Sequence, residues 1–158
     1  MANGAPEPAE ILDTEMRTEL AVRRTALIDV DDDTIAFVEG AFDRCRDAVA
    51  AFHQVTLTGR EGAGFLRYDV GGFYRPHRDR AEVDAWPEAA FRRIALVLFL
   101  NDDFDGGALR LIADDGPPLM VQPRAGTLVA FDAATLHEVL PVTRGVRETV
   151  VDWLTDQS

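Results

Sequence analysis

Two histidines and an aspartate in this sequence have the types and spacing of a metal site. His77 and Asp79 are separated by one residue in the run YDVGGFYRPHRDRAEVD, and His137 follows much later in the chain. Alternate residues of a β-strand point to the same face, so His77 and Asp79 are expected to share one space. Two imidazoles and one carboxylate on one face of an octahedral ion leave three positions open, which suits non-haem Fe(II) and its oxygen chemistry.

The same residues have a simpler explanation, in which His77 and Asp79 form a surface ion pair and His137 is a loop histidine. The letters HRD also occur in protein-kinase catalytic loops, where an asparagine follows soon after. Here RAEV follows at residues 80–83, so the kinase interpretation is set aside. The third histidine, His53, has no acidic partner at strand spacing, and we expect it to take no part.

Arg147 and Tyr68 are candidates for binding an anion inside the fold. Arg147 shares its parity on a terminal strand with Thr149, Val151 and Trp153, and a face that carries Val and Trp is expected to be an inner one. An unpaired arginine is rarely buried, so it needs an anion there. A dicarboxylate co-substrate would supply one, bound bidentately. Tyr68 alternates with polar residues and is expected to face inward, either at the site or as a structural tyrosine bonded to a carbonyl.

The elements that must position these residues are predicted to be short strands behind one strong helix. Residues 33–55 form that helix, opened by Asp33 and Thr34, with an apolar stripe that includes Cys45. From Gly64 onward, short β-like runs alternate with turn residues, as is typical of antiparallel sandwiches and barrels. The predicted fold is mainly β with flanking helices: a double-stranded β-helix of the jelly-roll, cupin-like kind.

Length and charge limit the classes of protein to consider. The 158 residues suit one domain, predicted at residues 11–158 behind a loose tail at residues 1–10. A net charge of −12 repels phosphate backbones, so no nucleic-acid partner is expected, and no apolar run approaches a membrane span. The single cysteine and the lack of a secretory signal at the start predict a cytoplasmic protein. The oligomeric state stays open.

Three runs resemble the core of the prolyl 4-hydroxylase-like Fe(II)/2-oxoglutarate dioxygenases. They are YDVGGFYRPHRD, RRIALVLFLNDDFDGGALRL and PRAGTLVAFDAATLHEVLPVTRGVRETVVDWL, and the resemblance runs from about Phe65 to Leu154. It implies Fe(II) as the metal, 2-oxoglutarate and O2 as co-substrates, and stimulation by ascorbate. The implied reaction converts 2-oxoglutarate to succinate and CO2 while a substrate C–H bond is hydroxylated.

The resemblance also implies a role for each site residue. His77, Asp79 and His137 match the iron ligands, and Arg147 matches the basic residue that pairs with the distal carboxylate of 2-oxoglutarate. Tyr68 matches a tyrosine that lies beside this co-substrate.

On the substrate side, the resemblance assigns Tyr74 to a lining position. Arg93 matches an active-site arginine of some members, although Arg92 is adjacent. The polar segment at residues 80–91, with Trp86 near its middle, is interpreted as a lid.

Two departures from the family pattern affect the co-substrate end. Phe99 replaces an aromatic hydroxyl, and the apolar pair Ala108-Leu109 replaces a polar residue after the double glycine. Tyr68 or Thr143 is therefore expected to help Arg147 hold the carboxylate.

The substrate implied by the resemblance is a prolyl residue in a peptide or protein. The alternatives are a free amino acid or other small molecule as substrate, and a non-catalytic jelly-roll domain that senses or binds a ligand.

Overall fold

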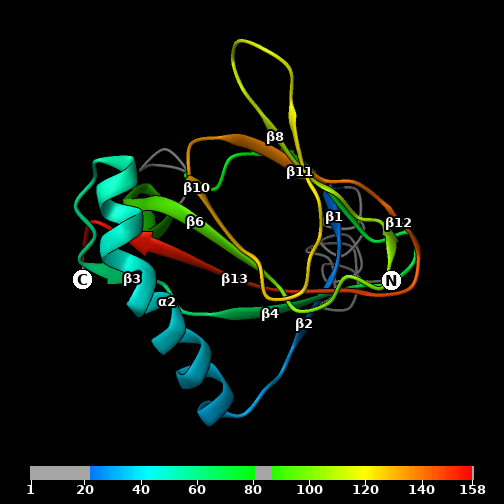
Figure 1. Cartoon of the computed structure of the whole chain (residues 1–158), viewed down its shortest axis with the longest axis horizontal. Coiled ribbons are helices and arrows are strands. Elements are labelled where there is room, and N and C mark those ends of the chain that lie inside the picture. Colours follow the sequence, from blue (N-terminus) through cyan, green and yellow to red (C-terminus); the bar gives the residue numbers. More distant parts are fainter. Residues whose placement is uncertain (1–21, 81–86, 158) are drawn as a thin grey trace, which may run out of the picture.

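Two packed β-sheets with a long helix on the outside make up most of the computed structural model, which describes residues 22–80 and 87–157 (Figure 1). The tail predicted at residues 1–10 and the middle of the predicted lid, residues 81–86, lie outside these ranges. Within them, none of the helices has the length and apolar character needed to span a bilayer.

The first sheet has five strands and carries both histidines of the predicted metal site. Its spatial order is β1 (Arg23–Arg24), β5 (Phe73–His77), β11 (Leu136–Val139), β8 (Leu109–Ile112) and β9 (Leu119–Val121). Strands β5 and β11 are antiparallel, and His137 is paired directly with His77. The return of the chain to β11 therefore places two imidazoles opposite each other, as the sequence predicts for a jelly roll.

The second sheet has six strands and carries the predicted anion-binding residues. Its order is β10 (Leu128–Asp132), β6 (Arg92–Phe99), β13 (Arg147–Thr155), β4 (Gly64–Tyr68) and β2 (Ala26–Ile28), with β3 (Gly59–Arg60) also pairing with β13. Every pairing is antiparallel, and Arg147 on β13 lies opposite Tyr68 on β4. A small two-stranded sheet of β7 (Asp105–Gly106) and β12 (Val142–Arg144) stands apart. The predicted mainly β, two-sheet fold is confirmed.

Helix α2 (Asp32–His53) agrees with the helix predicted at residues 33–55. It begins where the Asp31 side chain accepts a hydrogen bond of 2.7 Å from the backbone N–H of Thr34, which satisfies a donor of the first turn. It ends at Gln54, whose left-handed φ of 55° is typical of a helix C-terminus.

The buried face of α2 packs on the outer face of the six-stranded sheet (Figure 1). Its buried residues are Val38 and Phe42. They contact apolar side chains that point outward from three strands: Phe65, Ile94, Leu96, Val150 and Leu154. Cys45 is half-buried on the helix, whereas Phe52 near its end is 82% exposed. The helix thus leaves the inner face of the sheet free for a site.

The N-terminal strands connect the two sheets. Strand β1 pairs with β5 of the first sheet, and β2 pairs with β4 of the second. Only Thr25 separates them, and its hydroxyl donates to the carbonyl of Arg67 at 3.0 Å. A single residue therefore carries the chain from one sheet to the other.

Candidate metal centre and active site

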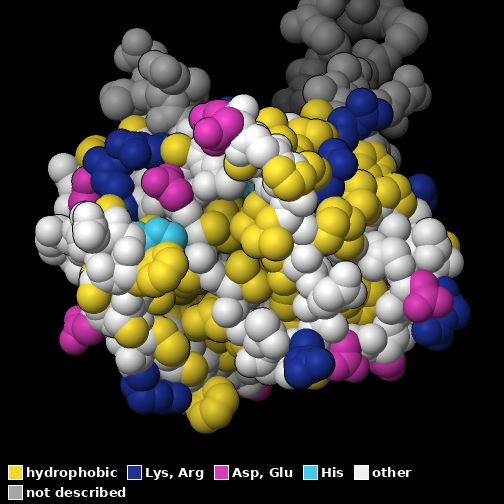
Figure 2. Space-filling view, turned by 45° about the horizontal axis from the view of Figure 1, so that its top comes forward, with side chains coloured by type: hydrophobic (Ala, Val, Ile, Leu, Met, Phe, Trp, Pro, Cys, Tyr) yellow, Lys and Arg dark blue, Asp and Glu magenta, His cyan; other side chains and the backbone are white. Residues whose placement is uncertain are grey.

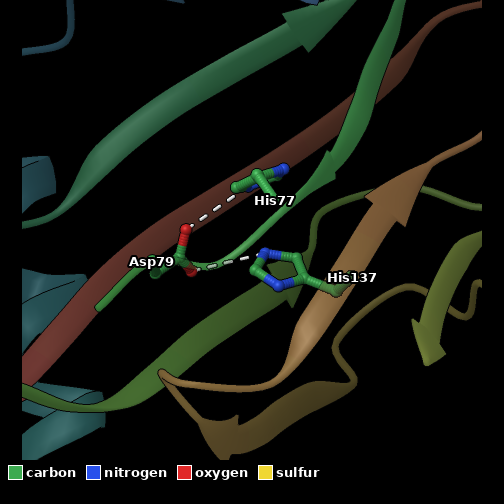
Figure 3. A group of neighbouring side chains, drawn as sticks. All are labelled: His77, Asp79 and His137. Atoms are coloured by element: carbon green, nitrogen blue, oxygen red, sulfur yellow. Dashed lines mark ion pairs between the residues drawn. The ribbon is translucent and has the colours of Figure 1, made fainter. Parts of the chain in front are cut away.

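His77, Asp79 and His137 meet between the sheets, as the sequence predicts (Figure 3). Nε2 of His77 lies 3.3 Å from Oδ1 of Asp79, and Nε2 of His137 lies 3.4 Å from Oδ2. The possible ligand atoms of all three residues lie within 4.8 Å of one another. Ligands at right angles around an ion with bonds of about 2.1 Å are roughly 3 Å apart, so one ion fits among them with little movement.

The backbone fixes which nitrogen each histidine can offer to a metal. Nδ1 of His77 lies 2.7 Å from the carbonyl of Arg75, and Nδ1 of His137 lies 2.9 Å from the carbonyl of Thr135. A carbonyl can only accept a hydrogen bond, so Nδ1 carries the proton in both rings. A neutral ring in this form directs the lone pair of Nε2 to the shared space, the arrangement that outer hydrogen bonds give to metal-binding histidines.

Asp79 differs from the expectation because it lies beyond the end of its strand. Strand β5 ends at His77, and the backbone N–H groups of Asp79 and Arg80 both donate to the carbonyl of Ala133, at 3.0 and 2.9 Å. The carboxylate therefore reaches the histidines through a turn held by another segment. Strand alternation within β5 does not place it.

Burial and mutual contacts set the charges of this cluster in the metal-free protein. Burial alone would raise the pKa of Asp79, but hydrogen bonds with His137 and His77, helped by the Trp153 side chain, hold the pKa well below its usual range. Burial would lower the pKa of His137, but the hydrogen bond and charge of Asp79 raise it. Asp79 is therefore an ionised ligand at neutral pH, and a metal must compete with a proton for His137.

Arg147 is a buried cation with unused hydrogen-bonding capacity. The residue is 1% exposed, and its Nε has no hydrogen-bond partner among the described residues. Its Nη1 lies 3.5 Å from the hydroxyl of Thr149, and the guanidinium carbon lies 4.7 Å from the ring centre of Tyr68 and 5.3 Å from that of Phe99. Burial lowers the pKa of Arg147, while contact with Tyr68 opposes this. An anion at this position would satisfy the group, as the sequence predicts.

Gly107 makes room for that guanidinium. Its φ is +63°, and a Cβ atom there would lie 2.9 Å from Cδ of Arg147. Both the backbone conformation and the close approach therefore require glycine. The second glycine of the run DDFDGGALRL is thus explained by its close approach to the side chain of Arg147.

One cavity of about 340 Å³ connects these groups. Its lining includes the metal-site residues His77, Asp79 and His137, together with Arg147 and Tyr68. The face in Figure 2 carries a central area of hydrophobic side chains with a histidine at its edge. A metal and a small anionic molecule would share this space.

Tyr74 also lines the cavity, on the metal side. Its ring stacks on His77 with the ring centres 3.7 Å apart and the planes 21° apart. Burial raises the pKa of its hydroxyl, so this group stays protonated at neutral pH. The side chain is therefore a flat wall next to the metal cluster.

Two residues predicted from the sequence do not line this cavity. Thr143 is exposed on β12, and Thr149 stands beside Arg147 in its place. Arg93 pairs with Asp156 and is absent from the lining, which Arg92 joins instead. Thr143 lies on β12, before the turn that leads into β13. Simple alternation would place Arg93 on the inner face with Ala95 and Val97, but the pairing of β6 with β13 is irregular between Ile94 and Arg92, and Arg92 faces the cavity instead.

Sequence reasoning gave no role to Arg92, Glu61 or Trp153, which surround Asp79. Arg92 donates to the Asp79 carbonyl at 3.0 Å and is paired with Glu61, and its guanidinium carbon lies 3.8 Å from the ring centre of Trp153. Trp153 shares strand parity with Arg147, and this parity was the one sequence signal that Trp153 faces the site. Nothing in the local sequence indicates that Glu61, far from the other two, belongs with them.

The sequence comparison decides the family. The model of the 2OG-Fe(II) oxygenase superfamily matches residues 63–155, which contain the three metal-site residues and Arg147. The chain belongs to this superfamily. Membership implies Fe(II), 2-oxoglutarate and O2, and the residues present fit them: two histidines whose Nε2 atoms face the shared space, an ionised aspartate, and a buried arginine whose Nε has no partner among the described residues.

Known members of the superfamily support this assignment. A PKHD-type hydroxylase of Synechococcus sp. (strain JA-2-3B'a(2-13)) is 37% identical over 89 residues, covering 55% of this chain and 39% of the relative. The chain thus spans about two fifths of the length of the curated relatives it matches.

Solved structures resemble the chain over nearly all of its length. A prolyl-4-hydroxylase from Pseudomonas putida has a TM-score of 0.68 and 30% identity, over 96% of this chain and 89% of that one. A prolyl hydroxylase from Trichoplax adhaerens, solved with a peptide fragment of the hypoxia inducible factor oxygen degradation domain, has a TM-score of 0.69 and 19% identity, over 94% and 78%. At that identity the second likeness shows the shared fold alone.

Proposed function

We propose that this chain is an Fe(II)- and 2-oxoglutarate-dependent dioxygenase that hydroxylates a C–H bond of a prolyl residue in a peptide or protein. The observation that carries the proposal is the cavity that joins the His77, Asp79 and His137 cluster to the buried Arg147. A metal cluster alone is compatible with many activities. A buried guanidinium in the same cavity adds a place for the distal carboxylate of the co-substrate.

Two groups of residues have separate tasks in this function, metal binding and co-substrate binding. His77, Asp79 and His137 hold the iron, and Arg147 binds the distal carboxylate of 2-oxoglutarate. Iron and co-substrate supply the oxidising chemistry. The chain contributes binding and orientation, because Tyr68 packs against the guanidinium and the surrounding apolar side chains keep water from the anion.

The prolyl substrate is the finer part of the proposal. It is supported by the Pseudomonas putida prolyl-4-hydroxylase, which matches 96% of this chain at 30% identity. It is also supported by the ring of Tyr74 beside the metal cluster, because a pyrrolidine ring packs well on an aromatic face. The cytoplasm is the proposed location, supported by the single Cys45, which leaves no internal disulfide to form.

The test is succinate formation by the purified protein with Fe(II), 2-oxoglutarate and a library of proline-containing peptides, with mass spectrometry of the peptides. We expect succinate and a peptide mass increase of one oxygen atom, and neither from His137→Ala. The matched control is His53→Ala, because His53 ends helix α2 away from the cluster and should keep full activity.

Other outcomes would change the proposal in defined ways. Turnover with free L-proline, but with no peptide of the library, would replace the peptidyl substrate with a free amino acid. Binding of 2-oxoglutarate without succinate formation from any substrate would favour the non-catalytic binding domain. Equal activity of His137→Ala and the wild type would contradict the metal site itself.

A further inference from the structure

Arg92 at the start of β6 links a surface turn to the proposed metal site. The residue is 4% exposed, and its guanidinium donates hydrogen bonds to both Asp79 and Glu61. Nη1 donates to the backbone carbonyl of Asp79 at 3.0 Å. Nη2 donates to Oε1 of Glu61 at 2.7 Å, and Nε donates to the other oxygen of the same carboxylate. Such a two-pronged pair fixes the plane of a guanidinium as well as its position.

The aromatic ring of Trp153 supports the same guanidinium from one face. The guanidinium carbon of Arg92 lies 3.8 Å from the ring centre, within the range of a cation–π contact. The indole nitrogen is buried without a conventional hydrogen-bond partner among the described residues, and Trp153 lines the same cavity as Asp79. Trp153 therefore fixes the arginine on the side of the cavity that holds the proposed metal ligand.

Glu61 is itself held in place by the turn in which it lies. Its backbone N–H donates to the carbonyl of Trp153 at 3.0 Å. The residues on either side are both fixed by Asp152, which is fully buried: Arg60 pairs with Oδ2 at 3.1 Å, and the N–H of Gly62 donates to Oδ1 at 2.9 Å. The turn is thus attached to β13 at three successive residues, and the Glu61 carboxylate has a defined position from which to hold Arg92.

Asp79 needs this support more than the two histidines do. His77 and His137 lie on paired strands in direct register, whereas Asp79 lies in the turn after β5. Its backbone N–H is bound by the Ala133 carbonyl, and its backbone carbonyl is bound by Arg92. Outer groups of this kind commonly orient the ligands of a metal.

We infer that Arg92, held by Glu61, is a positioning residue that keeps Asp79 in the orientation required for metal binding. The inference rests on the proposed metal site and adds to it a role for two residues on the side of the cavity next to β13. Arg92 acts here through Asp79 and not by contact with the reacting atoms. The guanidinium is required because a lysine has one compact head group, which cannot bind Glu61 in two places and also reach the Asp79 carbonyl.

The test measures Co(II) affinity by calorimetry and the visible spectrum of the Co(II)-loaded protein, so it does not depend on turnover. Arg92→Met keeps a chain to pack on Trp153 but removes every donor, and Glu61→Gln keeps the shape but removes the charge. We expect the Kd for Co(II) to rise by roughly 10–100-fold in Arg92→Met and by about tenfold in Glu61→Gln, in line with losses typical of outer groups at metal sites. Arg92→Lys should recover part of the loss.

Two comparisons make the result specific. Arg93→Met removes the neighbouring arginine, which is also paired with a carboxylate but points away from the cavity, and should leave the affinity unchanged. Adding Glu61→Gln to Arg92→Met should cause no further loss, because Glu61 acts through Arg92. At saturating Co(II), a change in the visible bands of Arg92→Met would report an altered Asp79 ligand, which a general loss of stability would not produce.

The possible failures are distinguishable. Wild-type Co(II) affinity and spectrum in folded Arg92→Met and Glu61→Gln would overturn the positioning role and leave the proposed function standing. If Arg92→Met does not fold, Glu61→Gln decides the question, because the Glu61 side chain is 27% exposed and its replacement is milder. A wild-type protein that binds no Co(II) would overturn the metal site, and with it this role.

Discussion

Arg147 shows how much one buried residue determines about this site. Its Nε has no hydrogen-bond partner among the described residues, yet the side chain is fixed by Tyr68, Phe99 and the space that Gly107 leaves. In the proposed function, the distal carboxylate of 2-oxoglutarate would offset the cost of burying this cation. The residue therefore favours the co-substrate-bound form over the empty one.

Replacing Arg147 with Met should weaken 2-oxoglutarate binding at least tenfold. A charge-assisted hydrogen bond contributes about 1.5–3 kcal/mol, and the methionine removes the whole pair. Calorimetric titration of 2-oxoglutarate into the Co(II)-loaded protein measures this. Arg144→Met is the control, because Arg144 is exposed and pairs with Asp105 on the small sheet. Equal affinities of wild type and Arg147→Met would show that the carboxylate binds elsewhere.

Metal binding should weaken as the pH falls, because of His137. The pKa of this residue in the metal-free protein is raised by Asp79 above its ordinary value of 6.5, so the proton is held to a higher pH than usual. A metal must displace this proton, and the affinity should therefore fall by about tenfold per pH unit once the pH is below the raised pKa. Co(II) titrations between pH 8 and pH 5.5 test this, and a constant affinity over that range would contradict it.

At the scale of elements, Asp152 attaches helix α2 and the turn at residues 60–62 to β13. It is fully buried and pairs with Arg60, which also binds the carbonyl of Glu39 on the helix at 3.1 Å. Asp152→Ala should lower the free energy of unfolding by about 2 kcal/mol, because it leaves the backbone N–H of Gly62 unpaired and removes one of the partners of the half-buried Arg60 guanidinium. Urea denaturation measures this. Asp105→Ala, at an exposed ion pair, should leave the midpoint unchanged; equal effects of both variants would refute the argument.

The elements that the sequence predicts correctly are those with a local pattern. Helix α2 has caps and an apolar stripe, β6 has a long apolar run, and β13 is rich in β-branched and aromatic residues. Strand β11 has no clear local pattern, because it has only four residues and they include the charged Glu138. It is a strand because β5 and β8 pair with it on both sides, and Arg110 neutralises that glutamate. Long-range pairing of this kind leaves no local signal.

For the site as well, the sequence predicts what depends on residue type and strand parity and misses what depends on pairing between distant segments. His77, His137, Arg147 and Tyr68 follow from residue type and strand parity, and all of them line one cavity. The choice between Arg92 and Arg93 does not follow, because parity with Ala95 favours Arg93 whereas an irregularity in the β6–β13 pairing turns Arg92 to the cavity. Thr143 lies on a strand of the separate small sheet, which its local sequence does not indicate.

At the scale of the whole molecule, ligands that bridge the sheets should stabilise the fold. The proposed metal contacts the first sheet and the co-substrate anion contacts the second, so their joint binding favours only the folded chain. Co(II) with 2-oxoglutarate at about 100 times its Kd should add about 2.7 kcal/mol. This corresponds to a rise in Tm of roughly 5–10 °C for a chain of this size, measured by calorimetry.

The control ligand is glutarate, which has both carboxylates but lacks the keto group. It should raise the Tm of the Co(II)-loaded protein by less than 2-oxoglutarate does, and a chelator should reverse both effects. If 2-oxoglutarate gave no rise in the presence of Co(II), the two sheets would not share one ligand site.

The order of the strands has a consequence for the synthesis of the protein. Strand β13 pairs with β3, β4 and β6, and a ribosome makes it after all three. The six-stranded sheet therefore has no centre until Arg147–Thr155 has emerged, although α2 and most of the first sheet are already available. A nascent chain that stops before residue 147 lacks both the central strand and the anion-binding arginine. Such a chain keeps the proposed metal ligands without the proposed co-substrate site, and the edges of β4 and β6 that β13 would pair with stay open to proteases that remove incompletely folded chains.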